Sequence, residues 1–242
     1  MGFSNSYEDM LRADAYAQLE FSGTYYLAYR DLPNIITKHA KGTDALDFGC
    51  GTGRSTRFLK KLGFKAVGVD ISKNMIHKAK TADPNGDYQL VKDEQFEQFK
   101  DGRFDLVLSI FTFDNIPTRE KKLRNLREIA RVLKADGVFV NLVSSPEIYV
   151  HEWASFSTKD FSENRHAKSG NVVKIIITDI EDKRPVEDVV FHPKDYHNIF
   201  RESGFTTVNA HKPLAKKSEP HKWVNETKIA PWTIYILKKT NN

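Results

Sequence analysis

The chain has 242 residues, of which 40% are hydrophobic and 29% are charged, a composition typical of a globular protein with one large core. It has no apolar run long enough for a membrane span, and its N-terminus lacks the basic and apolar regions of a secretory signal, so we expect no membrane association. The single cysteine, Cys50, excludes an internal disulfide and favours a cytoplasmic location.

The net charge of +5 makes an anionic partner such as RNA one option. The densest basic segment, residues 119–134, holds seven Lys or Arg and two Glu. Leu123, Leu126, Ala130 and Leu133 recur in it at helical spacing, which predicts an amphipathic helix with its charges in solvent. The pattern therefore favours a solvated surface over a nucleic-acid groove.

Helical and strand patterns alternate through the first 143 residues. The predicted helices are 6–20, 33–41, 53–62, 73–81 and 118–134, and the predicted strands are 44–48, 65–70, 88–91, 104–110 and 138–143. Ser72 is the expected cap of the fourth helix, and Gly137 marks the end of the fifth. This alternation predicts an α/β fold with a doubly wound parallel sheet.

The pattern changes after residue 143. An aromatic and polar stretch, 144–170, precedes two strand patterns at 172–180 and 186–191, which predict an inserted β-hairpin. A helix at 193–203 and strands at 206–210 and 233–237 complete the chain. We therefore expect a single domain that consists of an N-terminal cap (1–40), a core (41–143), an inserted lid (144–192) and a C-terminal part (193–242).

The most informative motif is a glycine-rich turn within residues 45–55. An apolar strand runs through Asp47 and is followed by Gly49, Gly51 and Gly53, a pattern that brings backbone N–H groups against a ligand. The dinucleotide fingerprint G-x-G-x-x-G would place the third glycine one residue later, and a carboxylate before the turn would repel a pyrophosphate. No G-K-[ST] follows the glycines, which excludes a P-loop.

The end of the next strand indicates a nucleoside ligand. Asp70 lies 17 residues beyond the last of these glycines, and in a parallel sheet its carboxylate would lie beside the turn and accept from both hydroxyls of a ribose. Ile71 and Met75 could then enclose an adenine ring. Asp93 and Ser109 come at the ends of later strands, so we expect them at the same edge of the sheet.

The sequence resembles the class I S-adenosylmethionine-dependent methyltransferases. The motifs that carry the resemblance lie at residues 46–53, 67–72, 104–109 and 129–139, and their order and spacing match as well as their content. The resemblance implies a Rossmann-like fold with a mostly parallel seven-stranded sheet whose last two strands are antiparallel. It further implies S-adenosylmethionine as the cofactor. Related enzymes often cover the cofactor with N-terminal residues, which fits the helical N-terminal cap and the hairpin lid that the pattern predicts. No Cys/His cluster suggests zinc, so we expect no metal ion.

The same resemblance implies roles for the residues of the glycine-rich turn. Gly49, Gly51 and Gly53 would let the backbone approach the methionine portion of the cofactor. Asp47 would lie near its ammonium group or organise the loop.

Further roles fall on the strand ends. Asp70 would bind the ribose, Asp93 would accept from the adenine amino group, and the carbonyl of Ser109 would accept from the ammonium group, with Phe111 nearby. Glu94 and Asp87 compete with Asp93 for its role.

The cofactor's carboxylate needs a cation, and an arginine can bind a carboxylate bidentately. Arg30 lies in an aromatic segment just before the core, and we predict that it binds this carboxylate with help from Tyr25. The alternative is a surface arginine beside a packed aromatic cap.

Methyl transfer is an in-line displacement that depends mainly on alignment and on the exclusion of water, so it requires no fixed catalytic residue. A general base is needed only where the acceptor arrives protonated. Acceptor-side candidates, each with a structural or surface role as the alternative, are Tyr149, His151, His197 and Glu226.

The leading hypothesis is a cytoplasmic methyltransferase acting at O or N of a small-molecule acceptor, which the insert would hold. Residues 113–116 lack the [DN]-P-P-[YF] signature of enzymes that methylate amino groups of nucleic acids. The alternatives are an RNA or protein methyltransferase that uses the basic surface, a non-catalytic nucleoside-binding protein of the same fold, and a nicotinamide-dependent oxidoreductase.

Overall fold

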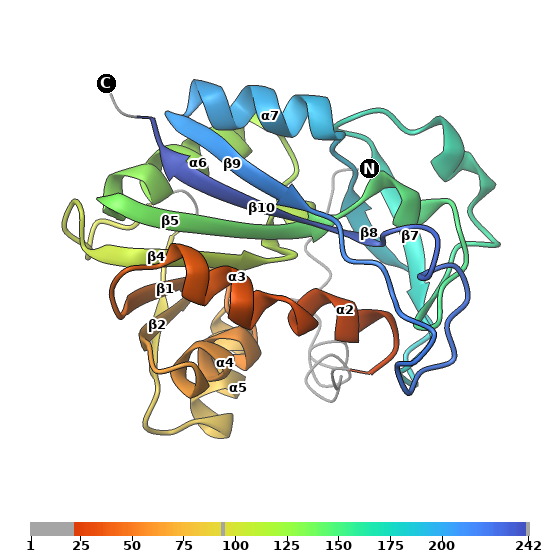
Figure 1. The fold of residues 1–242 in the computed structure, drawn as a ribbon, viewed down its shortest axis with the longest axis horizontal. Helices are drawn as coiled ribbons and strands as arrows, with labels where there is room; N and C mark the ends of the chain where they lie inside the picture. Colours follow the sequence, from red (N-terminus) through yellow and green to blue (C-terminus); the bar gives the residue numbers. More distant parts are fainter. Residues whose placement is uncertain (1–21, 93–94, 241–242) are drawn as a thin grey trace.

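The computed structural model describes residues 22–92 and 95–240, and the predicted helix at 6–20 lies outside them (Figure 1). The main sheet consists of β1 (Asp44–Phe48), β2 (Lys65–Asp70), β3 (Asp87–Leu90), β4 (Phe104–Ile110), β5 (Leu133–Ser144), β9 (Phe205–His211) and β10 (Trp232–Lys239). The α-helices are α2 (Thr24–Arg30), α3 (Leu32–His39), α4 (Arg54–Lys61), α5 (Lys73–Ala82), α6 (Arg119–Val132) and α7 (Pro193–Glu202).

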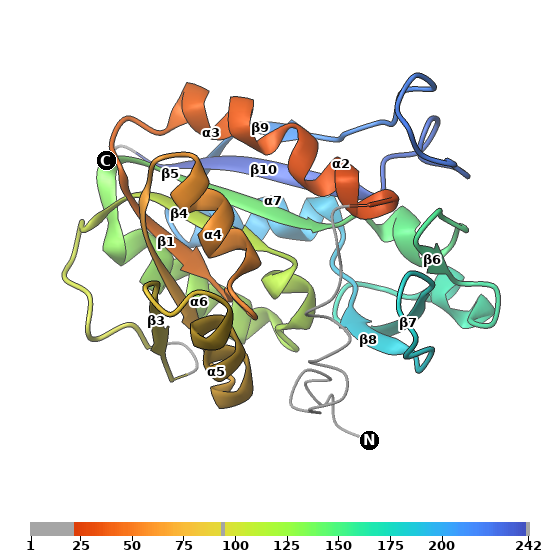
Figure 2. The ribbon, with the colours of Figure 1, turned by 90° about the horizontal axis from the view of Figure 1, so that it is seen from below.

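The seven strands lie in the order β3-β2-β1-β4-β5-β10-β9. The first five are mutually parallel, and β10 runs antiparallel to both of its neighbours. This arrangement confirms the mostly parallel, doubly wound sheet. In Figure 2, α2, α3, α4 and α5 lie on one side of the sheet, whereas α6 and α7 lie on the other.

Two hydrophobic cores fill the space on either side of the sheet, because successive side chains of a strand point to opposite faces. In β10, Ile234 and Ile236 join the core that contains α2, α3 and α4, whereas Tyr235 and Leu237 join the core under α6 and α7. With both faces covered, the central strands are apolar along nearly their whole length.

Two departures from the predicted elements concern the α-helices. Residues 24–30 form a helix that the sequence analysis did not assign. The chain passes from α6 directly into β5 at Leu133, whose backbone pairs with Phe104, so the predicted helix stop at Gly137 is wrong. The register shift that follows this pair places Gly137 inside an irregular first part of the strand.

The inserted hairpin forms as expected. It consists of β7 (Val172–Ile177) and β8 (Val186–Val189), and β6 (Phe156–Ser157) adds a third antiparallel strand. The small sheet lies beyond the ends of β5 and β10 in both ribbon views, and its strand β8 contacts the 3-10 helix η2 (Thr112–Asn115) that follows β4. The insert therefore covers the edge of the main sheet at which the parallel strands end.

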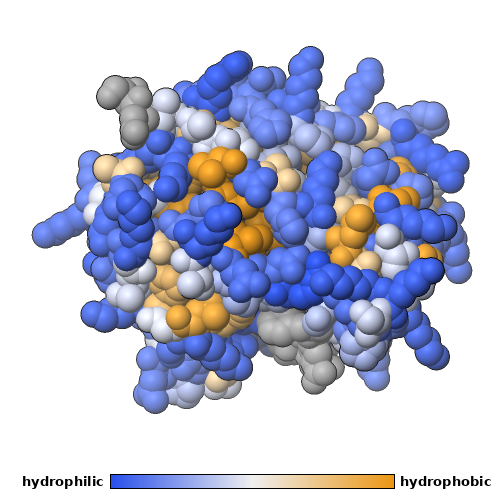
Figure 3. All heavy atoms as spheres, in the orientation of Figure 1, coloured by the Kyte–Doolittle hydropathy of each residue, from blue (hydrophilic) through white to orange (hydrophobic). Residues whose placement is uncertain are grey.

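The face seen in Figure 3 is mostly hydrophilic, with a few separate apolar patches. Among the residues that the structure describes, no helix is both long and apolar enough to cross a membrane.

The glycine-rich turn allows a direct test of the local fold. Gly53 has a φ of +80°, and a Cβ built on it would lie 2.7 Å from the ring of Tyr88. Gly63 has a comparable φ of +92° with no atom near such a Cβ. We therefore expect Gly63→Ala to lower the free energy of unfolding by about 1–2 kcal/mol, and Gly53→Ala by about 2–4 kcal/mol, measured by chemical denaturation. Equal losses would show that the packing against Tyr88 contributes nothing.

Candidate functional site

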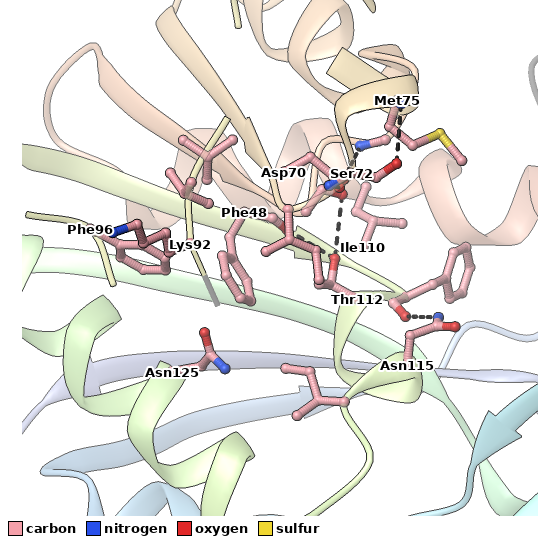
Figure 4. A pocket seen from close by; sticks show the side chains of 17 residues that line it. Phe48, Asp70, Ser72, Met75, Lys92, Phe96, Ile110, Thr112, Asn115 and Asn125 are labelled. Atoms are coloured by element: carbon pink, nitrogen blue, oxygen red, sulfur yellow. Dashed lines mark hydrogen bonds between the residues drawn. The ribbon is translucent and has the colours of Figure 1, made fainter. Parts of the chain in front are cut away.

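A cavity of about 860 Å³, counting the space at its open mouth, lies where β1, β2 and β4 end. Its lining comes from these strand ends, the glycine turn, α5, η2 and α6 (Figure 4). Asp70, Ser72 and Met75 lie on one side of it, with Asn115 and Asn125 opposite. We refer to it as the first cavity.

The glycine turn forms one wall of the first cavity. Gly49 and Gly51 line the cavity with φ values of +73° and +53°, a conformation that side chains other than glycine rarely adopt. A Cβ on Gly49 would also collide with the side chain of Thr112, whose hydroxyl donates to the carbonyl of Phe48 at 2.9 Å. The turn is therefore held against η2 by contacts that only glycine permits.

Asp70 connects the second strand to this turn. One carboxylate oxygen accepts from the N–H of Gly51 at 2.9 Å, and the other accepts from the N–H of Ser72 at 2.8 Å. Burial raises the pKa of Asp70, although these backbone donors oppose the shift. Ser72 caps α5 by accepting from Met75, which confirms its predicted role. The carboxylate thus lies in the cavity wall where the sequence analysis expected a ribose ligand.

The predicted adenine residues also line the first cavity. Ile71 is half exposed and Met75 is buried, and Val91 and Phe96 add apolar surface on the same cavity. An exposed isoleucine beside a cavity offers a flat apolar contact that a planar ring can cover. Asp93, the predicted partner of the adenine amino group, lies outside the described residues.

Asp47 lies behind the turn and not in the cavity wall. It is fully buried, and its Oδ2 accepts from the hydroxyls of Ser55 at 2.7 Å and Thr56 at 2.6 Å. Oδ1 has no hydrogen-bond partner among the described residues. Burial raises the pKa of Asp47 to about 6. Of its two expected roles, the geometry matches the organisation of the loop, because both hydroxyls belong to the start of the helix that follows.

Ser109 and Phe111 sit at the end of β4. Ser109 is buried and pairs with Asn141 of β5, so its side chain does not line the cavity. Phe111 does line it, and among the described residues it is the one non-glycine residue with a left-handed φ, +61°. Such strain persists only where the surroundings enforce it, and it concentrates at binding sites. Phe111 also lines a second cavity.

The second cavity, of about 420 Å³ with its open space, adjoins the first, and Phe111 and Asn115 line both. Its other lining residues are mainly aromatic and aliphatic, from α2, the insert and the start of β10. They are Tyr25, Ile148, Tyr149, Phe156, Ile175, Ile177, Val186 and Trp232, together with Ser144 and the acidic residues Asp114 and Asp188. The insert therefore forms a pocket beside the first cavity.

Three buried charged residues accompany this cavity, and the sequence analysis missed all of them. Asp114 accepts from the N–H of Ser144 at 2.9 Å, and Asp188 accepts from the hydroxyl of Tyr149 at 3.0 Å. Burial raises the pKa of Asp114 to about 6 and that of Asp188 to about 8. No local motif marks these residues, because they meet only through contacts between distant segments.

Lys122 is the third of these residues and corrects the expectation that every charge on the basic helix lies in solvent. It is fully buried, donates to the carbonyl of Phe113, and lies 5.3 Å from the ring centre of Phe191. Burial lowers the pKa of Lys122 to about 8, although Asp114 and Asp188 favour its charged form. Leu123 and Leu126 are buried as predicted, and Leu133 is buried as the first residue of β5. At the end of α6, Ile129 and Val132 are buried, whereas Ala130 is only partly buried.

Tyr25 and Arg30 do not act together. Tyr25 packs into the second cavity, with its ring centre 5.0 Å from that of Phe156. The guanidinium of Arg30 forms ion pairs with Asp31 and Glu219, both at 2.8 Å, and lines neither cavity. Arg30 therefore does not lie where it could bind the carboxylate of a cofactor in the first cavity. Its position matches the alternative of a surface arginine beside a packed aromatic cap.

Of the acceptor-side candidates, the structure brings only Tyr149 to a cavity. His151 forms a 3.3 Å contact with Glu147, and His197 a 3.3 Å contact with Thr207, and neither histidine lines a cavity. The carboxylate of Glu226 is fully buried and accepts four hydrogen bonds, from the hydroxyl of Thr24 and from the N–H groups of residues 154, 224 and 225. Glu226 therefore joins α2 to the insert.

No group of three or more His, Cys, Asp and Glu side chains suited to a metal ion occurs within residues 22–92 and 95–240. The fold and the two cavities define an α/β protein with one cavity at the carboxyl ends of its parallel strands and a second, partly open cavity beside it.

Comparison with known proteins identifies the family. A family model described as a methyltransferase domain matches residues 46–141. An uncharacterized protein of Methanocaldococcus jannaschii, MJ1252, is 31% identical over 219 residues, which cover 86% of this chain and 81% of that protein. The N-demethylindolmycin N-methyltransferase of Streptomyces griseus is 26% identical over 223 residues, or 90% of this chain and 93% of that enzyme.

Solved structures agree on the fold. A crystal structure of a S-adenosylmethionine-dependent methyltransferase from Clostridium acetobutylicum superposes with a TM-score of 0.62 at 15% identity, over 97% of this chain and 96% of that one. The chain belongs to the class I S-adenosylmethionine-dependent methyltransferases. Binding of S-adenosylmethionine is therefore supported by the family, and the first cavity has the carboxylate, the apolar walls and the open backbone that this molecule needs.

The pH dependence of stability tests the burial of Asp47. Its raised pKa means that the folded state keeps the proton between about pH 4 and pH 6 while the unfolded state releases it, so its contribution to stability is lost as the pH rises through that window. We expect the free energy of unfolding of Asp47→Asn, minus that of wild type, to increase by up to about 3 kcal/mol from pH 4 to pH 7. A difference that does not change with pH would contradict the shifted pKa.

Replacement of Glu226 separates a structural role from a catalytic one. Glu226→Ala removes the acceptor of four hydrogen bonds, one of which, from the Thr24 hydroxyl, is fully buried, so we expect it to lower the free energy of unfolding by about 3 kcal/mol. Affinity for S-adenosylhomocysteine, measured by calorimetry well below the melting temperature, should stay within twofold of wild type. The exposed Glu147→Ala serves as the control, with a loss under about 1 kcal/mol. If Glu226→Ala keeps the stability of wild type but loses methyl transfer, the structural role is wrong and Glu226 is again a candidate catalytic residue.

Proposed function

We propose that this protein transfers the methyl group of S-adenosylmethionine to O or N of a small-molecule acceptor. The observation that carries the proposal is the pair of adjoining cavities, which share Phe111 and Asn115. In-line displacement needs the donor methyl group and the acceptor atom in contact, with water excluded. Two cavities that meet at one aromatic side chain provide that geometry.

The chain's own residues would divide the work between the two cavities. Asp70 would accept from the ribose hydroxyls with the lone pairs that Gly51 and Ser72 leave free, and Ile71 and Met75 would hold the adenine ring. The bound cofactor supplies a methyl group on a sulfonium, which is a good leaving group. The aromatic insert would orient the acceptor and exclude water.

Two observations favour a small acceptor over RNA. Basic residues on α6 are engaged by neighbouring acids: Arg119 pairs with Glu202, and Arg131 with Asp101 and Glu128. The relative from Streptomyces griseus is named for a small molecule. The single, buried Cys50 supports the expectation that the enzyme works in the cytoplasm.

The cofactor half of the proposal is tested by calorimetry with S-adenosylmethionine and S-adenosylhomocysteine. Asp70→Ala should weaken binding by about 1–3 kcal/mol, or about 5- to 150-fold, because the ribose hydroxyls and the N–H groups of the turn lose their acceptor. Asp136→Ala, at an exposed position of β5 outside both cavities, is the control and should bind as wild type does.

Two results would contradict the proposal. If wild type binds neither compound, the methyltransferase hypothesis is wrong, and the alternative of a non-catalytic protein with the same fold is favoured. If wild type binds both compounds but also binds RNA with an affinity that falls steeply with salt, the RNA alternative is favoured over a small acceptor.

A further inference from the structure

The second cavity places a cluster of four aromatic rings near a buried carboxylate, with Tyr149 as a fifth aromatic side chain in its lining. The ring centre of Trp232 lies 4.7 Å from that of Phe111, 5.7 Å from that of Phe156 and 6.1 Å from that of Tyr25. All four side chains line the cavity. Faces of aromatic rings attract cations, most strongly in desolvated sites.

Asp188 supplies a carboxylate next to these four aromatic rings. It belongs to β8, lines the cavity, and is nine-tenths buried. Its Oδ2 accepts from the hydroxyl of the buried Tyr149, and Oδ1 accepts no hydrogen bond from any residue that the structure describes. The Tyr149 bond fixes the orientation of the carboxylate and leaves one oxygen for a ligand.

Once both carboxyl groups are ionised, the nearby charges leave a negative excess around the cavity. Asp114 and Asp188 carry two carboxylates, whereas Lys122 supplies one ammonium, which is directed to the carbonyl of Phe113. An isolated buried carboxylate is costly, and a cation from a ligand would offset that cost. The cavity is therefore electrostatically suited to a cationic guest.

We propose that the methyl acceptor is an amine with an apolar body, that the four rings and Asp188 bind it as an ammonium ion, and that Asp188 then removes its proton. This inference rests on the proposed function and specifies its acceptor. The apolar body would occupy the aliphatic part of the cavity, lined by Ile148, Ile175, Ile177 and Val186.

The proton transfer prepares the nitrogen for reaction. An ammonium ion has no lone pair, so its N–H proton must first pass to a carboxylate oxygen of Asp188, which converts a buried ion pair into two neutral groups. The freed lone pair forms the N–C bond while the C–S bond of the donor breaks, with its electron pair left on sulfur. The product leaves as an ammonium ion, and Asp188 returns its proton to solvent.

The environment of Asp188 supports this role as a base. Burial, and then repulsion by Asp114, raise the pKa of Asp188 to about 8, whereas Tyr149 and Lys122 act in the opposite direction. A base that titrates near neutral pH is the most effective in general-base catalysis. Tyr196 is a further titratable group close to the two carboxylates.

The test compares amines with their alcohol analogues in binding, without turnover. Phenethylamine and tryptamine are titrated by calorimetry against 2-phenylethanol and indole-3-ethanol, with the protein saturated with S-adenosylhomocysteine. We expect at least one amine to bind wild type tenfold or more tightly than its alcohol. Asp188→Asn should abolish this preference. Glu187→Gln, on the neighbouring position of β8 that pairs with Lys174, should keep it.

The pH dependence gives a second measurement on wild type alone. Amine affinity should rise several-fold between pH 6 and pH 8.5 as Asp188 ionises, because an ammonium ion pairs only with the charged carboxylate. The affinity for the alcohols should not rise over the same pH range. The melting temperature of Asp188→Asn shows whether this variant folds. If it does not fold, the pH dependence of wild type still tests whether Asp188 binds the amine.

The inference is overturned if no amine binds more tightly than its alcohol, or if a folded Asp188→Asn protein keeps the preference. In either case the methyltransferase proposal stands, provided that S-adenosylhomocysteine binds. If wild type does not bind S-adenosylhomocysteine, the proposed function itself fails, and the inference fails with it.

Discussion

The Asp70 carboxylate holds the site together, because it joins two segments that the parallel sheet merely brings near one another. By accepting from Gly51 and Ser72, it fixes the glycine turn relative to the start of α5. The turn in turn depends on Asp47, whose bonds to the hydroxyls of residues 55 and 56 anchor the first turn of α4. Two carboxylates thus shape the donor side, one facing the cavity and one buried behind it.

The acceptor side is built in a different way. It depends on the strained backbone at Phe111, which places one ring between the two cavities, and on an insert that brings Asp188 against Tyr149. Nothing in this half resembles a nucleotide motif. The donor cavity is formed at the ends of β1, β2 and β4, whereas the second cavity is formed by the insert together with α2, η2 and the start of β10.

Local patterns predicted the strands of the main sheet and most helices, because hydrophobic periodicity and turn glycines act over a few residues. They also singled out Gly49, Gly51, Asp70, Ile71 and Met75, which line the first cavity. Long-range contacts could not be predicted in this way. Tyr149 meets Asp188 across 39 residues, and Lys122 is buried although a charge run usually marks a solvated face. The prediction that Arg30 binds the cofactor's carboxylate does not match the structure for the same reason. Arg30 pairs instead with Glu219, which lies 189 residues away in sequence, and no local pattern indicates that contact.

The most direct test of the central claim is a crystal structure of the protein with S-adenosylhomocysteine and an aromatic amine such as tryptamine. The account predicts the ribose hydroxyls on Asp70, the sulfur next to Phe111, and the amine nitrogen within hydrogen-bond distance of Asp188, inside the ring of four aromatic side chains. Density for the nucleoside outside the first cavity, or for the amine outside the second, would contradict the assignment of donor and acceptor sites.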